Sequence, residues 1–593
     1  MEPKTLWEKL WAYNAEGFYP CHMPGHKRRW GQINGQACPD GLRHSGTDGI
    51  RLEEMLQFIH SADITELLGF DNLAHPTGLL KELQEKAARV FGAEESWFLV
   101  GGSTAGIMVS VFAAFQRGDE VLLAPNCHLS VWRAAHLGGM KPVLLETGSS
   151  ASFFDTLTMP PLPTAEEVRQ AFQAHPALKG MVLTSPSYEG AVADVRGIAD
   201  AVHGAGGTLV VDCAHGAHFG FHPAFPESPV RQGADLVVQS LHKTLPAMTQ
   251  TAILHRASDR VDSRRIRRFL NTFQTSSPSY VLLASIDSCV NYLGRLSENP
   301  IVHAPYSQNS DDFRVKVESE DQILAGTLEK VDDDGQSEMV FGRFAGKLSE
   351  NPIAYAPHSQ NSDDFRDKVE NEDQILAAGQ TKVDSDGRPE MVFGRSGGEE
   401  SRAGFERFIQ FRKAFDREME ALQFLQVYKT RDYPGAVASD PGKVVFGSAA
   451  FSGPALAAYL RKAHKLELEM AAPTYCVAIM TVADGKEGWE RLAKGLLDAD
   501  GMCEASEERQ NALRGEAFST QSGRFCELGG GSIGDAPTAQ AETSQTEKDE
   551  SGFRLPKEGE AAEDFAAVYP PGIPLICPGE TWTAEKIGKL EAA

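Results

Sequence analysis

Two apolar, β-branched runs of the chain end directly in ionisable side chains. The run TLVV is followed at once by Asp212, and the run DLVVQSL by His242 and Lys243. A lysine removed from water has a lowered pKa and can act as an amine nucleophile. A buried carboxylate needs a partner and can hold a nearby heterocyclic nitrogen protonated. For each residue alone, an ordinary solvated lysine or a structural aspartate bonded to backbone amides is the alternative.

Other apolar runs end in groups that suit a flat, phosphorylated ligand. SWFLV leads into GGSTAG, where Ser103 and Thr104 offer hydroxyls at the start of an expected helix, a place where backbone N–H groups bind phosphate. This is not a dinucleotide fingerprint, because Ser103 stands where a glycine is required. The ring of His128, after EVLLAP, could stack on a flat cofactor, and Ser240 and His242 could add phosphate donors. A plain helix cap, turn residues and a capping histidine are the structural alternatives.

Together these groups match the requirements of pyridoxal 5'-phosphate. That cofactor needs a phosphate cradle, a stacking ring, a carboxylate at its pyridine nitrogen and a lysine for its aldehyde. We therefore expect Lys243 to form the Schiff base, and Asp212 to partner the ring nitrogen so that the ring becomes an electron sink. No metal site is expected, because the nine cysteines are scattered and include no C-x-x-C pair.

Short apolar runs that alternate with helical patterns between residues 60 and 285 must position these groups. Such alternation predicts an α/β fold with a mostly parallel sheet covered on both faces, and ligands bind such sheets at the carboxyl ends of the strands. Lys243 follows Asp212 by 31 residues, which predicts one strand–helix–strand step and side chains at the same edge. Residues 402–423 have the spacing of a long amphipathic helix, and LELEM, YCVAIMTVA and EGWERLAKGLLD predict two strands and a helix of a smaller α+β domain.

A tandem repeat interrupts this pattern. Residues 296–343 recur as residues 348–395, with 36 of 48 positions identical. The two copies carry a formal charge of −12, about half of the net charge of −25. Two copies are fewer than a solenoid needs, and the high charge predicts a weakly ordered or hairpin-like insertion without a catalytic part. A role in partner binding or assembly is the alternative.

The sequence patterns divide the chain into six expected segments. The chain of 593 residues is too long for one compact core. We expect an N-terminal segment over 1–60, a cofactor-binding large domain over 61–295, the acidic insertion over 296–395, a small domain over 396–500, a flexible low-complexity linker over 501–562, and the end of the small domain over 563–593.

Composition narrows the class of protein. With 41% apolar and 23% charged residues, the chain is typical of soluble globular proteins. The acidic excess weighs against nucleic acid as a partner. The most apolar stretch, 471–483, is too short to span a bilayer, and the first residues lack the apolar core of a signal peptide, so no membrane partner is expected. Scattered cysteines suit a reducing compartment, and we expect a cytoplasmic location.

Longer motifs resemble the Orn/Lys/Arg decarboxylase family of fold-type-I pyridoxal-phosphate enzymes, in its short form without an extra N-terminal receiver-like domain. The resemblance implies an aspartate-aminotransferase-like large domain and a smaller α+β C-terminal domain. The matching stretches, in the family's order, are HMPGHK (22–27), DITELLGFDNL (63–73), FLVGGSTAG (98–106), LTSPSYEG (183–190), VDCAHGAHFGFHP (211–223), GADLVVQSLHKTLPAMTQ (233–250), FQTSSPSYVLLASID (273–287) and YPPGIPLICPGE (569–580).

The resemblance also implies a role for each matching residue. Lys243 would be the Schiff-base lysine, Asp212 the partner of the pyridinium, and either Lys243 or His215 the group that returns a proton to Cα. Around the cofactor, His128 would stack on one side of the ring and Ala214 or His215 on the other, and the phosphate would be held by Ser103, Thr104, Ser240 and His242.

The activity that the resemblance implies is decarboxylation of a basic amino acid to agmatine, cadaverine or putrescine. Arginine is favoured, then lysine or ornithine, and a homodimer or larger even homo-oligomer is expected. An aminotransferase or lyase on the same fold, or a catalytically idle scaffold, is the alternative. Departures from the family pattern at Cys213, Glu189 and residues 28–30 bear on the substrate. Candidates for binding its distal cation are Asp63, Glu66 and Glu580.

Overall fold

The computed structural model describes most of the predicted large and small domains. By compactness, residues 1–303 and 395–593 form one unit and residues 304–394 a second. The described residues are 16–27, 63–147, 161–297, 397–448 and 450–519, four two-residue strands between 330 and 390, and scattered residues from 559 to 586.

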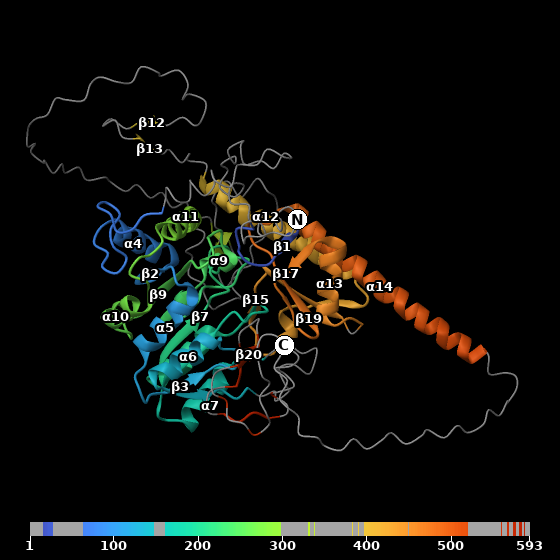
Figure 1. Ribbon diagram of the computed structural model, residues 1–593, viewed down its shortest axis with the longest axis horizontal. Helices are drawn as coiled ribbons and strands as arrows, with labels where there is room; N and C mark the ends of the chain where they lie inside the picture. Colours follow the sequence, from blue (N-terminus) through green and yellow to red (C-terminus); the bar gives the residue numbers. More distant parts are fainter. Residues whose placement is uncertain are drawn as a thin grey trace, which may run out of the picture. The chain divides into compact units, whose positions relative to one another are not determined.

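A seven-stranded sheet forms the centre of the large domain (Figure 1). Strand β9 runs antiparallel to both of its neighbours, and the other strands run parallel to one another. The predicted α/β fold with a mostly parallel sheet is confirmed. In spatial order the strands are β2 (Glu95–Leu99), β9 (Ala252–Arg256), β8 (Leu236–Gln239), β7 (Thr208–Asp212), β5 (Leu178–Thr184), β3 (Glu120–Leu123) and β4 (Lys141–Leu144).

Both faces of this sheet are covered by packed side chains. All residues of β8 are buried, and in β7 only Thr208 is partly exposed. Because successive side chains of a strand point to opposite faces, burial of every one requires packing on each face. Helix α5 (Gly102–Ala114) packs on β2, β7, β8 and β9. The other helices of the large domain are α4 (Leu79–Phe91), α6 (Leu129–Gly138), α7 (Ala165–Ala174), α8 (Val195–Gly204), α10 (Ser263–Phe273) and α11 (Tyr280–Ser297).

The connection from β7 to β8 differs from the predicted strand–helix–strand step. Residues 213–235 are all described, and they contain one 3-10 turn, η2 (Pro229–Arg231), and no α-helix. The run AHGAHFGFHPAFPESP explains this, because glycine and proline disfavour a helix interior. Strand β8 nevertheless lies parallel to β7, with Asp212 opposite Val238, so the two strands end at the same edge.

An antiparallel sheet forms the small domain. In spatial order its strands are β14 (Leu425–Val427), β16 (Lys443–Ser448), β19 (Tyr475–Ile479) and β18 (Met470–Ala471). Strand β1 (Tyr19–Cys21) pairs in parallel with β17 (Leu466–Leu468), so part of the expected N-terminal segment is built into this domain. The sequence pattern pointed to β17 and β19, whereas β16 was not predicted.

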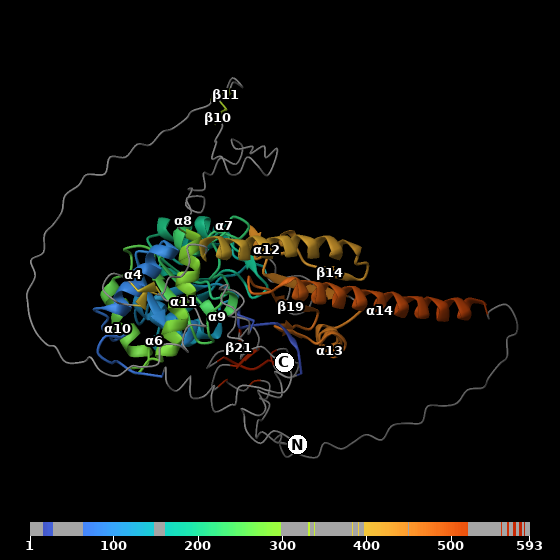
Figure 2. The ribbon, with the colours of Figure 1, turned by 90° about the horizontal axis from the view of Figure 1, so that it is seen from above.

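Three helices accompany the small sheet: α12 (Gly397–Glu418), α13 (Gly453–His464) and α14 (Lys486–Ser519). Helices α12 and α14 are in contact and lie side by side (Figure 2). Helix α14 continues to Ser519, past residue 501 where the sequence predicts the linker to begin, and the domain boundaries stay predictions. Among the helices within the described ranges, none combines the length and apolarity that a bilayer-spanning segment requires.

Each copy of the acidic repeat contains a short hairpin. Strand β10 (Lys330–Val331) pairs antiparallel with β11 (Ser337–Glu338), and β12 (Lys382–Val383) pairs in the same way with β13 (Pro389–Glu390). The two hairpins occupy corresponding positions of the two copies. The other residues of the insertion lie outside the described ranges.

Candidate active site

A cavity of about 410 Å³ lies at the carboxyl ends of β3, β5, β7 and β8. Parallel strands end at one edge of a sheet, so residues that follow different strands meet there. The cavity is lined by all nine residues that the sequence predicts around a cofactor: Ser103, Thr104, His128, Asp212, Ala214, His215, Ser240, His242 and Lys243. Their roles toward a cofactor remain predictions.

The start of helix α5 provides one end of this cavity. None of the described side chains caps the helix start, and its first residues, Gly102, Ser103 and Thr104, line the cavity at the positive end of the helix dipole. The N–H of Gly102 donates to the carbonyl oxygen of Gln250 at 2.9 Å. The hydroxyls of Ser103 and Ser240 are hydrogen-bonded to each other beside the helix start. The carbonyl oxygen of Thr251 lies 2.8 Å from Nδ1 of His242. This end is suited to a phosphate monoester.

Asp212 lies at the tip of β7 and is 5% exposed. Its Oδ1 accepts a hydrogen bond of 3.1 Å from the backbone N–H of Ala214. The carboxylate therefore has the backbone partner that a structural aspartate would have, and it also faces the cavity. A ring nitrogen placed here would meet a desolvated negative charge, which favours its protonated form.

The sequence left open whether His128 caps a helix or stacks on a flat cofactor, and its position in the structure allows both. It is the N-cap of helix α6, where its Nδ1 accepts from the backbone N–H of Ser130 at 3.1 Å. It also lines the cavity. Burial lowers the pKa of the His128 imidazole, so the ring presented to the cavity is neutral and flat. A neutral imidazole is suited to stacking on an aromatic ring.

Lys243 occupies the single-turn helix α9 (Leu241–Thr244) directly after β8. Its Nζ lies 3.1 Å from Nε2 of His215, and Nδ1 of His215 lies 2.9 Å from Nζ of Lys443. Burial lowers the pKa of Lys243, although the negative charge of Asp212 opposes the shift. Burial also lowers the pKa of Lys443 to about 8. Two amines with lowered pKa values therefore flank one imidazole.

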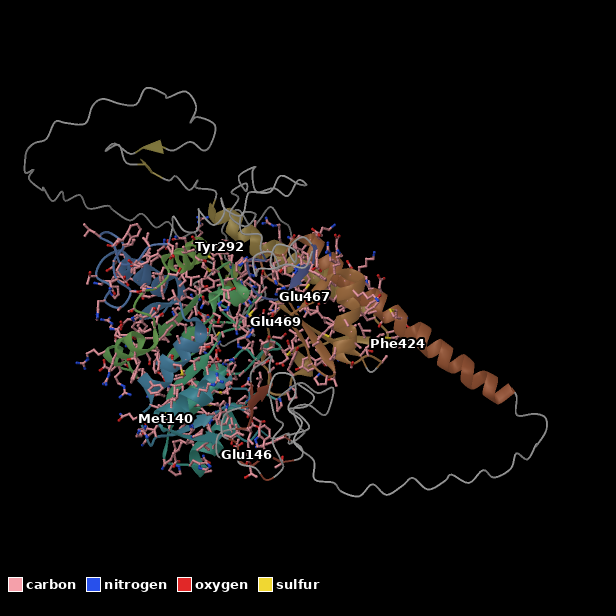
Figure 3. All side chains as sticks on the ribbon, in the orientation of Figure 1. Met140, Glu146, Tyr292, Phe424, Glu467 and Glu469 are labelled. Carbon is pink, nitrogen blue, oxygen red and sulfur yellow. The ribbon has the colours of Figure 1, made fainter. Side chains whose placement is uncertain are left out.

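Two glutamates that the sequence did not assign lie near these amines. Glu469 accepts hydrogen bonds from the hydroxyl of Tyr188 at 2.5 Å and from the backbone N–H of Met23 at 3.0 Å. Burial acts to raise the pKa of Glu469, but the charge of Lys443 and the hydrogen bonds outweigh it and lower the pKa. Figure 3 shows Glu469 where the small sheet meets the large domain. Glu189 lines the cavity itself, held by Ser187 at 2.9 Å and Tyr475 at 2.8 Å.

Besides Glu189, the sequence departs from the family pattern at Cys213 and at residues 28–30. Cys213 is fully buried and lies 3.8 Å from the side-chain nitrogen of Gln239. Residues 28–30 lie outside the described ranges. The cavity lining includes none of the three predicted candidates for binding a distal cation, Asp63, Glu66 and Glu580.

Buried polar atoms without partners test whether the cavity suits a polar ligand. Within the described part of the chain, Oδ1 of Asn126 and Oγ1 of Thr184 are buried without a hydrogen bond, and both residues line the cavity. Such atoms cost free energy unless a ligand or water satisfies them. The helix start, paired hydroxyls, carboxylate, neutral imidazole and lysine of lowered pKa fit the phosphate, ring and aldehyde of pyridoxal phosphate.

Comparison with known sequences agrees with this arrangement. The model of the Orn/Lys/Arg decarboxylase major domain matches residues 4–328, more than half of the chain. Uncharacterized protein YaaO of Bacillus subtilis is 38% identical over 49% of this chain and 57% of its own length. An arginine decarboxylase of Bacillus subtilis is 31% identical over 45% of this chain and 50% of its own length. The chain thus spans about half the length of these curated relatives.

Comparison with solved structures supports the fold. The constitutive lysine decarboxylase of Escherichia coli has a TM-score of 0.53 and 16% identity, over 99% of this chain and 78% of that one. Lysine decarboxylase A of Pseudomonas aeruginosa has a TM-score of 0.54 and 16% identity, over 100% and 78%. The chain therefore belongs to the Orn/Lys/Arg decarboxylase family, and pyridoxal phosphate is its cofactor.

Proposed function

We propose that the chain catalyses the decarboxylation of a basic amino acid, with arginine favoured over lysine and ornithine. The observation that carries the proposal is the convergence of Lys243, Asp212 and the start of helix α5 on one cavity. The preference for arginine rests on relatives named arginine decarboxylase, one of them 31% identical over 45% of the chain.

Pyridoxal phosphate, when bound, supplies an aldehyde and an electron sink that stabilises negative charge at the Cα of the substrate. Lys243 would hold the aldehyde, because its lowered pKa leaves a larger share of neutral amine at neutral pH. Asp212 would keep a proton on the pyridine nitrogen. The hydroxyls of Ser103 and Ser240 and the first N–H groups of α5 would bind the phosphate.

Orientation within the cavity decides which bond of the substrate breaks. A site that holds the bond between Cα and the carboxylate perpendicular to the cofactor ring favours loss of carbon dioxide. Lys243 and His215 both line the cavity and lie 3.1 Å apart, and one of the two would return a proton to Cα. Among the described residues that line the cavity, the carboxylates are those of Asp212 and Glu189, which makes Glu189 our candidate for meeting the distal cation.

We also propose that the protein acts in the cytoplasm as a homodimer or larger even homo-oligomer. Leu67, Leu68 and Phe70 are exposed large apolar residues on one loop, which is typical of a surface that another molecule covers. The six cysteines within the described ranges are buried and form no disulfide, which suits a reducing compartment.

Product analysis with arginine, lysine and ornithine offered together tests the function. With added pyridoxal phosphate and no keto acid, we expect carbon dioxide and agmatine as the main amine. A product that forms only when a keto acid is supplied would instead indicate an aminotransferase. If no amine forms and borohydride fixes no cofactor to the chain, the protein is an idle scaffold. The Lys243→Ala variant is the control for background release of carbon dioxide.

A further inference from the structure

A second lysine touches the imidazole that contacts the proposed cofactor lysine. Lys443 begins strand β16 of the small domain, and its Nζ lies 2.9 Å from Nδ1 of His215. Nε2 of the same ring lies 3.1 Å from Nζ of Lys243. Lys443 is 5% exposed and His215 is 6% exposed, so water contributes little to these contacts. These side chains thus form a continuous row of hydrogen-bonding nitrogens, in which His215 and Lys443 are buried and Lys243 is partly buried.

The numbers of N–H donors and lone pairs limit how many positive charges Lys443, His215 and Lys243 can carry together. A neutral imidazole has one N–H donor and one lone pair, whereas a lysine ammonium can only donate. If both lysines were charged, the imidazole N–H would face a second donor, and one of the two contacts would be repulsive. Both contacts are hydrogen bonds when one lysine is neutral, when the imidazole is charged and both lysines are neutral, or when all three groups are neutral, because a neutral amine can both donate and accept. No fully bonded arrangement carries more than one positive charge.

The surrounding charges favour Lys443 as the resting place of this charge. Glu469, Asp440 and Glu189 all act to keep Lys443 protonated, and its Nζ lies 5.2 Å from the ring centre of Tyr188, a cation–π distance. Lys243 is influenced by Asp212 and then Glu469, and Asp212 would be paired with the cofactor ring. His215 is held neutral by burial and then by Lys243 and Lys443, and any charge on His242 or His128 would act in the same direction.

We propose that Lys443 acts through His215 as a positioning residue that keeps Lys243 a neutral amine, with one positive charge shared along the three side chains. In this arrangement Lys443 donates to Nδ1 of His215, and the N–H at Nε2 donates to Lys243. Shifting both hydrogen-bonded protons along the chain moves the charge from Lys443 to Lys243 without moving a heavy atom.

The single proton shared by the three side chains also matches the one proton that decarboxylation consumes at Cα. This part of the inference rests on the proposed function. The bond between Cα and the carboxylate breaks, carbon dioxide leaves, and the electron pair left at Cα takes one proton. The proton passes from Lys443 through His215 to Lys243 and then to Cα. The chain of three side chains becomes neutral and regains its single proton from solvent.

The pH dependence of cofactor capture tests the proposal without relying on turnover. The capture rate is followed by absorbance after pyridoxal phosphate is mixed with the apoprotein between pH 6 and 10, and it depends on the fraction of Lys243 that is neutral. In the wild type we expect a midpoint well below the ordinary lysine pKa of about 10.4. A wild-type midpoint at the ordinary value would overturn the proposal with no variant needed.

Two substitutions separate a shared charge from a structural role. Lys443→Met removes the positive charge that disfavours protonation of Lys243, so the profile moves to higher pH and capture at pH 7 slows about tenfold for each pKa unit. In Lys443→Arg the guanidinium always donates, so Lys243 stays neutral and capture is kept, while turnover falls about a hundredfold because that group cannot release its proton. Lys462→Met, an exposed lysine of α13, is the matched control and should leave the profile unchanged.

The outcomes are distinguishable from failure of the proposed function. If Lys443→Met and Lys443→Arg slow capture equally at all pH values, Lys443 is structural and the proposal is wrong. If Lys443→Arg keeps both capture and turnover, no proton passes along the chain. If the wild type releases no carbon dioxide from any basic amino acid, the function is wrong, but the capture profiles still decide whether the charge is shared.

Discussion

At the residue scale, burial determines which groups of the site carry a lone pair. Lys243, Lys443 and His215 all have pKa values lowered by desolvation, which disfavours their charged forms. A neutral amine or imidazole can accept a proton or attack a carbonyl, which a solvated lysine does only at high pH. The two lysines placed on the surface would be almost fully protonated at neutral pH and would lack this reactivity.

Asp212→Asn tests the role of the buried carboxylate. The amide oxygen can still accept the hydrogen bond from Ala214, so the fold should be kept. It has no negative charge to hold a pyridine nitrogen protonated, so we expect the turnover rate to fall at least about a hundredfold. Cofactor affinity and the thermal unfolding midpoint serve as readouts of binding and folding. Wild-type turnover in this variant would mean that Asp212 does not act on the cofactor ring.

Ser240→Ala tests the phosphate end of the cavity. The variant removes one of the two paired hydroxyls beside the start of α5. A hydrogen bond to a charged group contributes about 1.5–3 kcal/mol, so the dissociation constant for pyridoxal phosphate should rise at least tenfold in equilibrium titration. Ser277→Ala, at an exposed serine, is the matched control. An unchanged dissociation constant in Ser240→Ala would assign the phosphate to another part of the cavity.

At the element scale, the sequence predicted those parts of the site that follow from strand direction. Asp212, His128 and Lys243 all follow parallel strands, and their convergence needs only the α/β pattern. Lys443 and Glu469 lie on the antiparallel small domain, and their approach to His215 and Tyr188 depends on how the two domains pack. The sequence signal for Lys443 was its position at the start of the apolar run KVVFG, because a charged residue at the beginning of a buried strand needs a partner.

The N-terminal strand is held to the small domain by a buried lysine. Nζ of Lys27 donates to the carbonyls of Pro20, His22 and Ile479 at 3.1, 2.9 and 2.7 Å and lies 3.8 Å from Asp484. Removing it takes a positive charge away from the buried Asp484, which keeps its hydrogen bonds from the Tyr19 hydroxyl and the backbone N–H of Thr481. This contact joins segments that are more than 450 residues apart, so local sequence patterns could not reveal it.

Lys27→Met should therefore destabilise the fold. Loss of one partner of a buried ion pair costs about 3–5 kcal/mol, so the free energy of unfolding in a urea titration should fall by roughly that amount. Lys81→Met replaces an exposed lysine of α4 and should change the unfolding free energy by less than about 0.5 kcal/mol. Equal unfolding curves for the two variants would contradict a stabilising role for Lys27.

At the scale of the whole molecule, the proposed chemistry belongs to one of the two compact units. Every residue that lines the cavity lies within residues 1–303 or 395–593. We expect that replacing residues 304–394 with a flexible linker keeps both the rate of pyridoxal phosphate capture and the unfolding midpoint of the rest. Loss of capture in a folded variant would instead favour a role for the acidic repeats in assembly or activity.

The position of the cofactor on the chain is the most direct test of the whole account. The protein is incubated with pyridoxal phosphate, reduced with borohydride, digested and mapped by mass spectrometry. We predict the reduced cofactor on the peptide that contains Lys243, at about one equivalent per chain. Attachment at Lys443 or at surface lysines, or no attachment to a folded protein, would contradict the central claim.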